Sequence, residues 1–461
     1  MDARRIVPTL DRRDDRRDIL LIVPGRGYTA YVLAILLLFN TLAFADRAVF
    51  SVVAHPIKQD LHLSDSQLGF LGGIAFILVY SVCALPIARL AEHHHRINLI
   101  SICLGLWSLA TAAGGLASTY WQMMLSRVLL GAGEAGATPG AHSVIGDYFP
   151  PDRRGMAIAV FALGVPLGAL VGSLVGGYVG ELLSWRAAFL TVGMAGLVVA
   201  LIMKLTISEP VRGAAEGRGT LVGATPSLAA TLRHLFARPS FIHMTIAFTL
   251  CALSTGGIYV FLPTVIVRQF GLGVGTAGLI FGLLGGAGSA VGMLFGGYLA
   301  DRLSRRDPRW YAWYPGIALI ISPPMLVLGL AQSDWRAMVG WLVLPFILKL
   351  SYIPAVLASY HAMTEPRMRA TTISIGFICS NVIGSGLGPL FAGMISDFVA
   401  GGGLPWLHAA LCGTPAPARG MCVSPQAFGL NIGVTVCCTL GLVGSLFYFL
   451  ASRTIKRDFL H

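Results

Sequence analysis

Long apolar segments recur along the chain and are separated by short polar stretches. Each segment has about 20 residues or more, the length that an α-helix needs to cross the hydrocarbon core of a bilayer. An even number of crossings places both ends of the chain on one side of the membrane. The pattern predicts twelve membrane-spanning helices, at residues 29–54, 66–91, 97–117, 121–147, 155–182, 185–207, 241–267, 275–300, 311–331, 336–361, 370–398 and 427–451.

The composition supports an all-α membrane protein. Of the 461 residues, 55% are hydrophobic and only 12% are charged, and the mean hydropathy is +0.74. A water-soluble protein carries roughly 25% charged residues, so a soluble globule is excluded. Intrinsic disorder needs low hydrophobicity, and a disulfide scaffold needs dense cysteine in a short chain, so both of these classes are excluded too.

Basic residues are divided unequally between the two sides of the predicted membrane. The loops on the side of the termini hold 25 of the 33 Lys and Arg residues, and the opposite loops hold five, which are Lys58, Arg186, Arg268, Arg336 and Arg419. By the positive-inside rule, both termini are expected to be cytoplasmic in the cell inner membrane. This distribution accounts for the net charge of +12 without a nucleic-acid partner.

The longest cytoplasmic loop divides the predicted spans into two groups of six. It covers residues 208–240, is rich in Gly, Ala and Arg, and is expected to be a linker with a short surface helix near 226–237. The first apolar segment lacks a small-residue cleavage site, so we expect a span there and no secretory signal. The expected organisation is an N-terminal tail at 1–28, six-helix bundles at 29–207 and 241–452, the linker, and a C-terminal tail at 453–461.

The two halves carry similar loop sequences. Ala88-Arg-Leu-Ala-Glu92-His-His-His-Arg96 follows the second span, and Gly297-Tyr-Leu-Ala-Asp301-Arg-Leu-Ser-Arg305-Arg306 follows the eighth. Both runs have a Leu-Ala-acid core and a trailing arginine at the same spacing. Parallel six-helix repeats are typical of transporters, in which the substrate site lies between the halves near the bilayer midplane.

Glycines recur every four residues in two of the predicted spans. Such spacing places small residues on one helix face, where two backbones can approach closely. The stripe admits two interpretations, static packing inside a bundle or a face that moves at the interface between the halves. Its members are Gly168, Gly172 and Gly176 in the fifth span and Gly288, Gly292 and Gly296 in the eighth.

The run from Gly297 to Arg306 resembles the loop motif of the major facilitator superfamily, with Ser304 in place of the usual glycine. The resemblance covers nearly the whole chain outside the tails. It implies the major facilitator fold, which has twelve helices in two pseudo-symmetric six-helix bundles, and a monomer. In that family these loop charges act as a conformational latch at the cytoplasmic face. The gate residues that the resemblance implies are Glu92, Arg96, Asp147, Arg153, Asp301, Arg302 and Arg305.

Within the superfamily, two helices resemble those of spinster lipid transporters. Phe44-Ala45-Asp46-Arg47 is similar to their Asp-Arg signature, as is Arg127 followed by Gly133-Glu134-Ala135. Organic anion:cation symporters carry very similar motifs. The segment from Asn381 to Asp397 favours spinster, because it is similar to the eleventh helix of that family. Spinster members move lysophospholipids and sphingosine phosphate.

Five charged residues lie away from the ends of the predicted spans, where hydrocarbon is expected, namely Asp46, Arg47, Arg127, Glu134 and Lys349. Left unpaired, they would cost about 12–18 kcal/mol, more than a typical net stability of about 5–15 kcal/mol. They must therefore pair, face a wet cavity or titrate. Arg127 and Glu134 are seven residues apart, about 10 Å along a helix, so a direct bond between them is disfavoured.

We expect Asp46 to contact Arg127, which leaves Glu134 as the less compensated carboxylate and the better proton carrier, with Asp46 second. Arg47, Arg127 or Lys349 could then hold the phosphate or carboxylate of a substrate, because the positive charges outnumber the negative ones. A fixed set of structural ion pairs is the alternative.

The sequence thus predicts a secondary active transporter that works by proton-coupled alternating access. The expected partners are protons, membrane lipids and an amphipathic anionic lipid such as a lysophospholipid. A symporter of a small organic anion and a non-transporting receptor of the same fold are the alternatives. No nucleophile or metal motif of an enzyme is found, and no cofactor or metal is expected.

The histidines and cysteines are expected to have mostly structural roles. His93–His95 are expected to be a solvent-facing loop variation rather than a metal site, because no other ligand cluster accompanies them. Cys412 and Cys422 share a loop that is predicted to be extracytoplasmic, where a disulfide and two free thiols are both possible.

Overall fold

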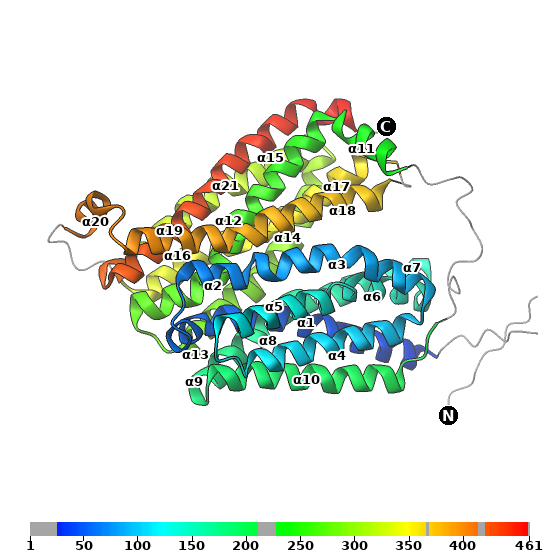
Figure 1. Cartoon of the computed structure of the whole chain (residues 1–461). Coiled ribbons are helices and arrows are strands. Elements are labelled where there is room, and N and C mark those ends of the chain that lie inside the picture. The colour runs from blue at the N-terminus through cyan, green and yellow to red at the C-terminus, as the bar shows by residue number, and fades with distance from the viewer. Residues whose placement is uncertain (1–24, 211–226, 366–367, 414–419, 460–461) are drawn as a thin grey trace, which may run out of the picture.

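The computed structural model describes residues 25–210, 227–365, 368–413 and 420–459, and every regular element in these ranges is a helix (Figure 1). The expected tails up to residue 24 and from 460, and the linker segment 211–226, lie outside the described residues. The short helix expected near 226–237 is α11, Leu228–Phe236.

The described residues of the first half form ten helices and one π-helical segment. These are α1 (Arg26–Asp60), α2 (Asp65–Gly72), α3 (Ile74–His93), α4 (Arg96–Gly114), α5 (Tyr120–Glu134), α6 (Ala137–Tyr148), α7 (Pro151–Ala162), α8 (Gly164–Leu174), η1 (Val175–Val179), α9 (Gly180–Leu182) and α10 (Trp185–Thr206).

In the second half, the described residues form α11, ten further helices, two π-helical segments and a short 3₁₀ turn. These are α12 (Pro239–Phe270), α13 (Val274–Phe281), η2 (Gly282–Gly288), α14 (Ser289–Ser304), α15 (Trp310–Leu330), α16 (Trp335–Ser351), α17 (Ile353–Met363), α18 (Arg369–Ile378), η3 (Cys379–Gly386), α19 (Leu387–Ala400), α20 (Pro405–Cys412), η4 (Gly420–Cys422) and α21 (Pro425–Asp458).

Eleven helices of the described residues are long and apolar enough to cross a membrane. The twelfth expected span, 121–147, is divided into α5 and α6 by a break at Ala135 and Gly136. Pro139 explains the break, because its ring clashes with the carbonyl of Ala135 four residues earlier and it has no N–H to donate. The broken pair takes the place of the twelfth span.

The helices form two bundles, one above the other in Figure 1. One hydrophobic cluster joins residues of both bundles, among them Val49 of α1 and Phe261 of α12. Nearer the chain ends the cores are separate: Leu36 belongs to a cluster of the first bundle alone, and Phe248 to a cluster of the second alone. The bundles are therefore closed against each other on the face opposite the start of α1 and the end of α21. We call these two sides the opposite face and the terminal face.

The glycine stripes pack within bundles. A Cβ on Gly172 of α8 would collide with the backbone of Ala45 in α1, and one on Gly292 of α14 with the backbone of Ile347 in α16. The structure thus fits the static interpretation at these positions. Other glycines lie between the bundles, since a Cβ on Gly177 would lie 3.1 Å from the Cα of Gly275.

Candidate functional site

A cavity of about 940 Å³ lies between the two bundles. Its charged lining residues, Arg47, Arg127 and Glu134, all come from the first bundle. The second bundle contributes uncharged polar and aromatic side chains, including Thr255, Tyr259, Phe281, Ser289, Phe377, Asn381 and Ser385. The cavity is therefore amphipathic, with its charge concentrated on one wall.

Arg47 of α1 bonds to Glu134 of α5. The guanidinium Nη2 donates to Glu134 Oε1 at 2.5 Å. Glu134 is buried, whereas about a third of the Arg47 side chain is exposed. The guanidinium also lies over Phe44, Phe76 and Tyr80, with centroid distances of 4.9, 4.6 and 5.7 Å. Aromatic faces attract a cation, so these rings hold Arg47 at the cavity wall without neutralising it.

Arg127 is held by aromatic rings instead of a carboxylate. Its guanidinium lies 4.3 Å from the centroid of Phe50 and 5.2 Å from that of Phe189. Its Nε and Nη2 atoms have no hydrogen-bond partner among the described residues. Buried donors of this kind are rarely left unsatisfied in a native state, so the expected role of Arg127 in holding an anion stays a prediction.

The expected pairing of the buried charges is wrong. Glu134 has an arginine partner, and the predicted ion pair between Asp46 and Arg127 is not formed. Asp46 is 2% exposed, and its Oδ1 atom has no hydrogen-bond partner among the described residues. Helical periodicity fixes the angle between Asp46 and Arg47 on their own helix, but not which of them faces α5.

Lys349 of α16 does not line the cavity. Its ammonium is buried in the second bundle, where it donates to the hydroxyl of Ser254 at 2.8 Å and to the carbonyl of Ser254 at 3.0 Å. It makes no ion pair with any described residue. Its expected role in holding the substrate stays a prediction.

On the opposite face, a cluster of charged and polar residues connects the bundles. Asp65 at the start of α2 accepts from Lys58 at 2.6 Å and from both Nη atoms of Arg268 at 2.7 and 2.8 Å. Asp397 of α19 accepts from the backbone N–H of Asp65 at 3.0 Å and of Ser66 at 2.8 Å, and from the Ser66 hydroxyl. We call Lys58, Asp65, Ser66, Arg268 and Asp397 the opposite-face cluster.

Its bonds are strong because each is assisted by charge. A carboxylate suits the unsatisfied N–H groups at a helix start, and Arg268 holds Asp65 through two parallel bonds. Sequence reasoning missed this cluster, although two of the five basic residues on the sparsely charged side, Lys58 and Arg268, belong to it.

For two of the gate residues implied for the terminal face, Arg96 and Arg302, the structure gives bonds within one bundle. Arg96 bonds to Asp147 and, at 2.7 Å, to Glu209, all of which belong to the first half of the chain. Arg153, Asp301, Arg302 and Arg305 are exposed, and Arg302 donates to Tyr298 of its own helix at 3.0 Å. The side chains of Glu92 and His93 lie outside the described residues.

Cys412 and Cys422 form a disulfide in the loop between α19 and α21. Their Cα atoms are 5.8 Å apart, within the usual range for a bridge. The six other cysteines are free, and four of them are buried in helices.

Comparison with known proteins gives a consistent result. A model described as Major Facilitator Superfamily matches residues 36–389. An "MFS-type efflux pump" of Mycolicibacterium smegmatis is 31% identical over 94% of this chain and 95% of its own. "Protein spinster homolog 1" of Xenopus tropicalis is 27% identical over 95% of this chain and 83% of its own.

A solved structure has the same fold over nearly the whole chain. It is described as a bacterial homolog to the human lysosomal transporter Spinster in an inward-facing and unoccupied conformation. The TM-score is 0.85 at 32% identity, covering 95% of this chain and all of that one.

Proposed function

The chain belongs to the Major Facilitator Superfamily and is a membrane transporter that resembles spinster proteins; from this we propose that it moves an amphipathic anionic lipid, such as a lysophospholipid or sphingosine phosphate, by proton-coupled alternating access. The observation that carries the proposal is the division of the cavity, with two arginines and a glutamate on one wall and only uncharged side chains among the described residues of the other. An anionic headgroup fits the first wall and an acyl chain the second.

The charge balance of the cavity supports coupling to protons. A phosphate monoester carries between one and a half and two negative charges at about pH 7. Arg47 and Arg127 would neutralise such a headgroup fully only if both Glu134 and Asp46 were protonated. A headgroup that bonds to Arg47 displaces Glu134 from it, and the displaced carboxylate then takes up a proton. Asp46 is the proposed second proton carrier, because it is buried beside Arg47 without a bond to its Oδ1 atom.

We assign the structure to the conformation that is open on the terminal face. The opposite-face cluster is formed, and the terminal-face charges bond within a bundle. The similar bacterial spinster structure, at 32% identity, is in an inward-facing state. We propose that the terminal face is cytoplasmic, that the membrane is the cell inner membrane, and that the transporter is a monomer.

Two measurements in detergent test the proposal. A lysophospholipid with a phosphate headgroup should raise the melting temperature more than a hydrophilic carboxylate does. The same ligand, added to weakly buffered wild-type protein, should cause net proton uptake, and Glu134→Gln should reduce that uptake. If only the carboxylate raises the melting temperature, the substrate is a small organic anion. A lysolipid that binds in detergent but is not transported into proteoliposomes would indicate a receptor.

A further inference from the structure

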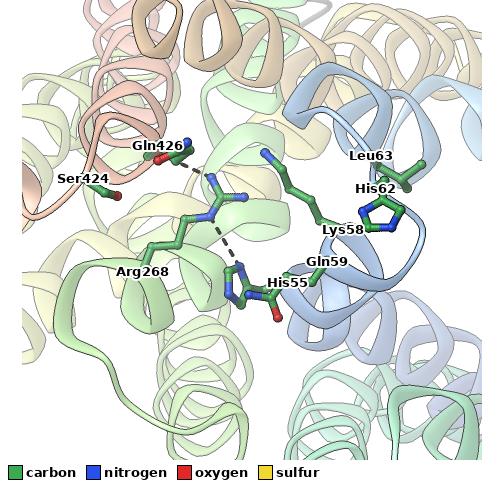
Figure 2. Close-up of a pocket in the computed structure, with 8 residues that line it drawn as sticks. All are labelled: His55, Lys58, Gln59, His62, Leu63, Arg268, Ser424 and Gln426. Carbon is green, nitrogen blue, oxygen red and sulfur yellow. Dashed lines mark hydrogen bonds between the residues drawn. The ribbon is translucent and has the colours of Figure 1, made fainter.

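A second pocket of about 500 Å³ lies on the opposite face, beside the closed contact between the bundles (Figure 2). The first bundle contributes His55 and Lys58 from α1, and His62 from the turn that follows it. The second bundle contributes Arg268 from the end of α12 and Gln426 from the start of α21. Anything that fills this pocket touches both bundles at once.

The pocket is positively charged. Its two cations, Lys58 and Arg268, share one carboxylate, Asp65, so the group of three keeps a charge of +1. Asp65 is already saturated, because it accepts from Lys58, from both Nη atoms of Arg268, and from Ser396 at 2.6 Å. No carboxylate is among the described residues that line the pocket.

Donors remain available toward the pocket. The Lys58 ammonium has three N–H groups, and one is used by Asp65. In Figure 2 the Arg268 guanidinium lies between His55 and Gln426, and its bonds to them are long, 3.4 Å to His55 Nδ1 and 3.5 Å to the Gln426 carbonyl. A shorter bond to an anion could replace either of them.

Two further features favour an anion. The pocket includes the first residues of α21, a helix of 34 residues whose N-terminal end carries a partial positive charge. His62 also has a φ of 53°, and it is the one residue other than glycine with a positive φ in the described part of the chain. Backbone conformations of this kind are uncommon and cluster at ligand sites.

We propose that this pocket binds a phosphate or carboxylate group, dissolved or borne by a lipid headgroup, and that the bound anion holds the opposite face closed. The anion bridges Lys58 of the first bundle to Arg268 and the start of α21 in the second. These partners move apart when the opposite face opens. A ligand that binds one state more tightly than the other shifts the equilibrium toward it, so the anion favours the state seen in the structure.

Binding is tested on the purified protein in detergent. Inorganic phosphate should raise the melting temperature by about 2 °C or more, beyond any effect of sodium chloride at the same ionic strength. Lys58→Gln and His62→Asn should weaken this rise, and His62→Asn leaves Asp65 and its bonds intact. Arg336→Gln is the matched control, because it removes the same charge from the same face outside the pocket. An equal rise with chloride, or an equal loss in Arg336→Gln, overturns the proposal.

Hydrogen exchange tests the closure. Phosphate should slow exchange of the amides at residues 65–70, whose first members donate to Asp397 across the bundles. Binding without slower exchange overturns the closing role.

Nanodiscs identify the source of the anion. If a lipid headgroup supplies the anion, nanodiscs of phosphatidylglycerol should raise the melting temperature even when no inorganic phosphate is added. Nanodiscs of phosphatidylcholine should not. If only dissolved phosphate acts, the ligand is soluble. If neither inorganic phosphate nor phosphatidylglycerol raises the melting temperature, the proposed site is overturned. None of these readouts requires transport, so they can fail or succeed independently of the proposed function.

Discussion

Replacing Asp65 with Asn should open the opposite face. In the structure Asp65 receives two charge-assisted bonds from Arg268 across the bundles, at 2.7 and 2.8 Å, and the side chains of both residues are almost fully buried. Hydrogen bonds to charged groups contribute about 1.5–3 kcal/mol each. Asparagine keeps one acceptor oxygen, so the closed state should lose about 2–3 kcal/mol relative to the open state.

Such a loss changes the populations greatly. It multiplies the ratio of open to closed by about 30–150. A wild type in which about 1% of molecules are open on this face would become about a quarter to more than half open.

The change can be measured as a distance between spin labels attached at Gln59 and Ser333, one on each bundle at the opposite face. Cys83 and Cys379, the half-buried free thiols, are first replaced by alanine. Asp60→Asn is the matched control, because Asp60 pairs with Arg186 inside the first bundle on the same face. The reasoning is refuted if Asp65→Asn leaves the distance distribution unchanged, or if Asp60→Asn broadens it equally.

Three further substitutions test the cavity, the glycine packing and the buried lysine. Arg127→Lys keeps the charge but loses the planar stacking on Phe50 and Phe189 and the paired donors, so lysolipid affinity should fall about tenfold. An unchanged dissociation constant would remove Arg127 from the site. Gly172→Val presses a side chain into Ala45 and should destabilise the protein by about 1–3 kcal/mol in thermal unfolding. The control Gly105→Val should be neutral, because a Cβ there meets nothing within 4 Å, and equal effects of the two variants would contradict the packing argument. Lys349→Met removes a buried cation that has no counter-charge among the described residues, so the melting temperature should stay unchanged or rise, and lysolipid transport should be retained. Loss of transport in a folded variant would place Lys349 in the transport path.

The sequence predicts the helical fold because membrane spans are set by the length of apolar segments. Eleven of the twelve expected spans are found as helices long enough to cross, and the other is interrupted where Pro139 removes a backbone donor. The spacing of the glycine stripes also predicts close backbone contact at Gly172 and Gly292, but the choice between a static and a moving face needs the position of the neighbouring helices.

The pairing of charges cannot be predicted in the same way. Arg47 meets Glu134, 87 positions away, because α1 and α5 have particular rotations about their axes. Asp65 meets Arg268 across 203 positions and two bundles. Residue spacing defines the faces of one helix but carries no information about which face of another helix lies opposite, and for the same reason it does not show that Lys349 lies apart from the cavity charges.

The proposed proton-coupled transport is tested most directly by uptake into proteoliposomes. A lysophospholipid should accumulate when a pH gradient is imposed and stop accumulating when a protonophore dissipates it. Glu134→Gln should lose the gradient-driven part while still exchanging substrate down its own gradient, and Glu365→Gln, which removes an exposed carboxylate, should behave as wild type. Full proton-driven accumulation by Glu134→Gln would contradict the proposed role of this carboxylate.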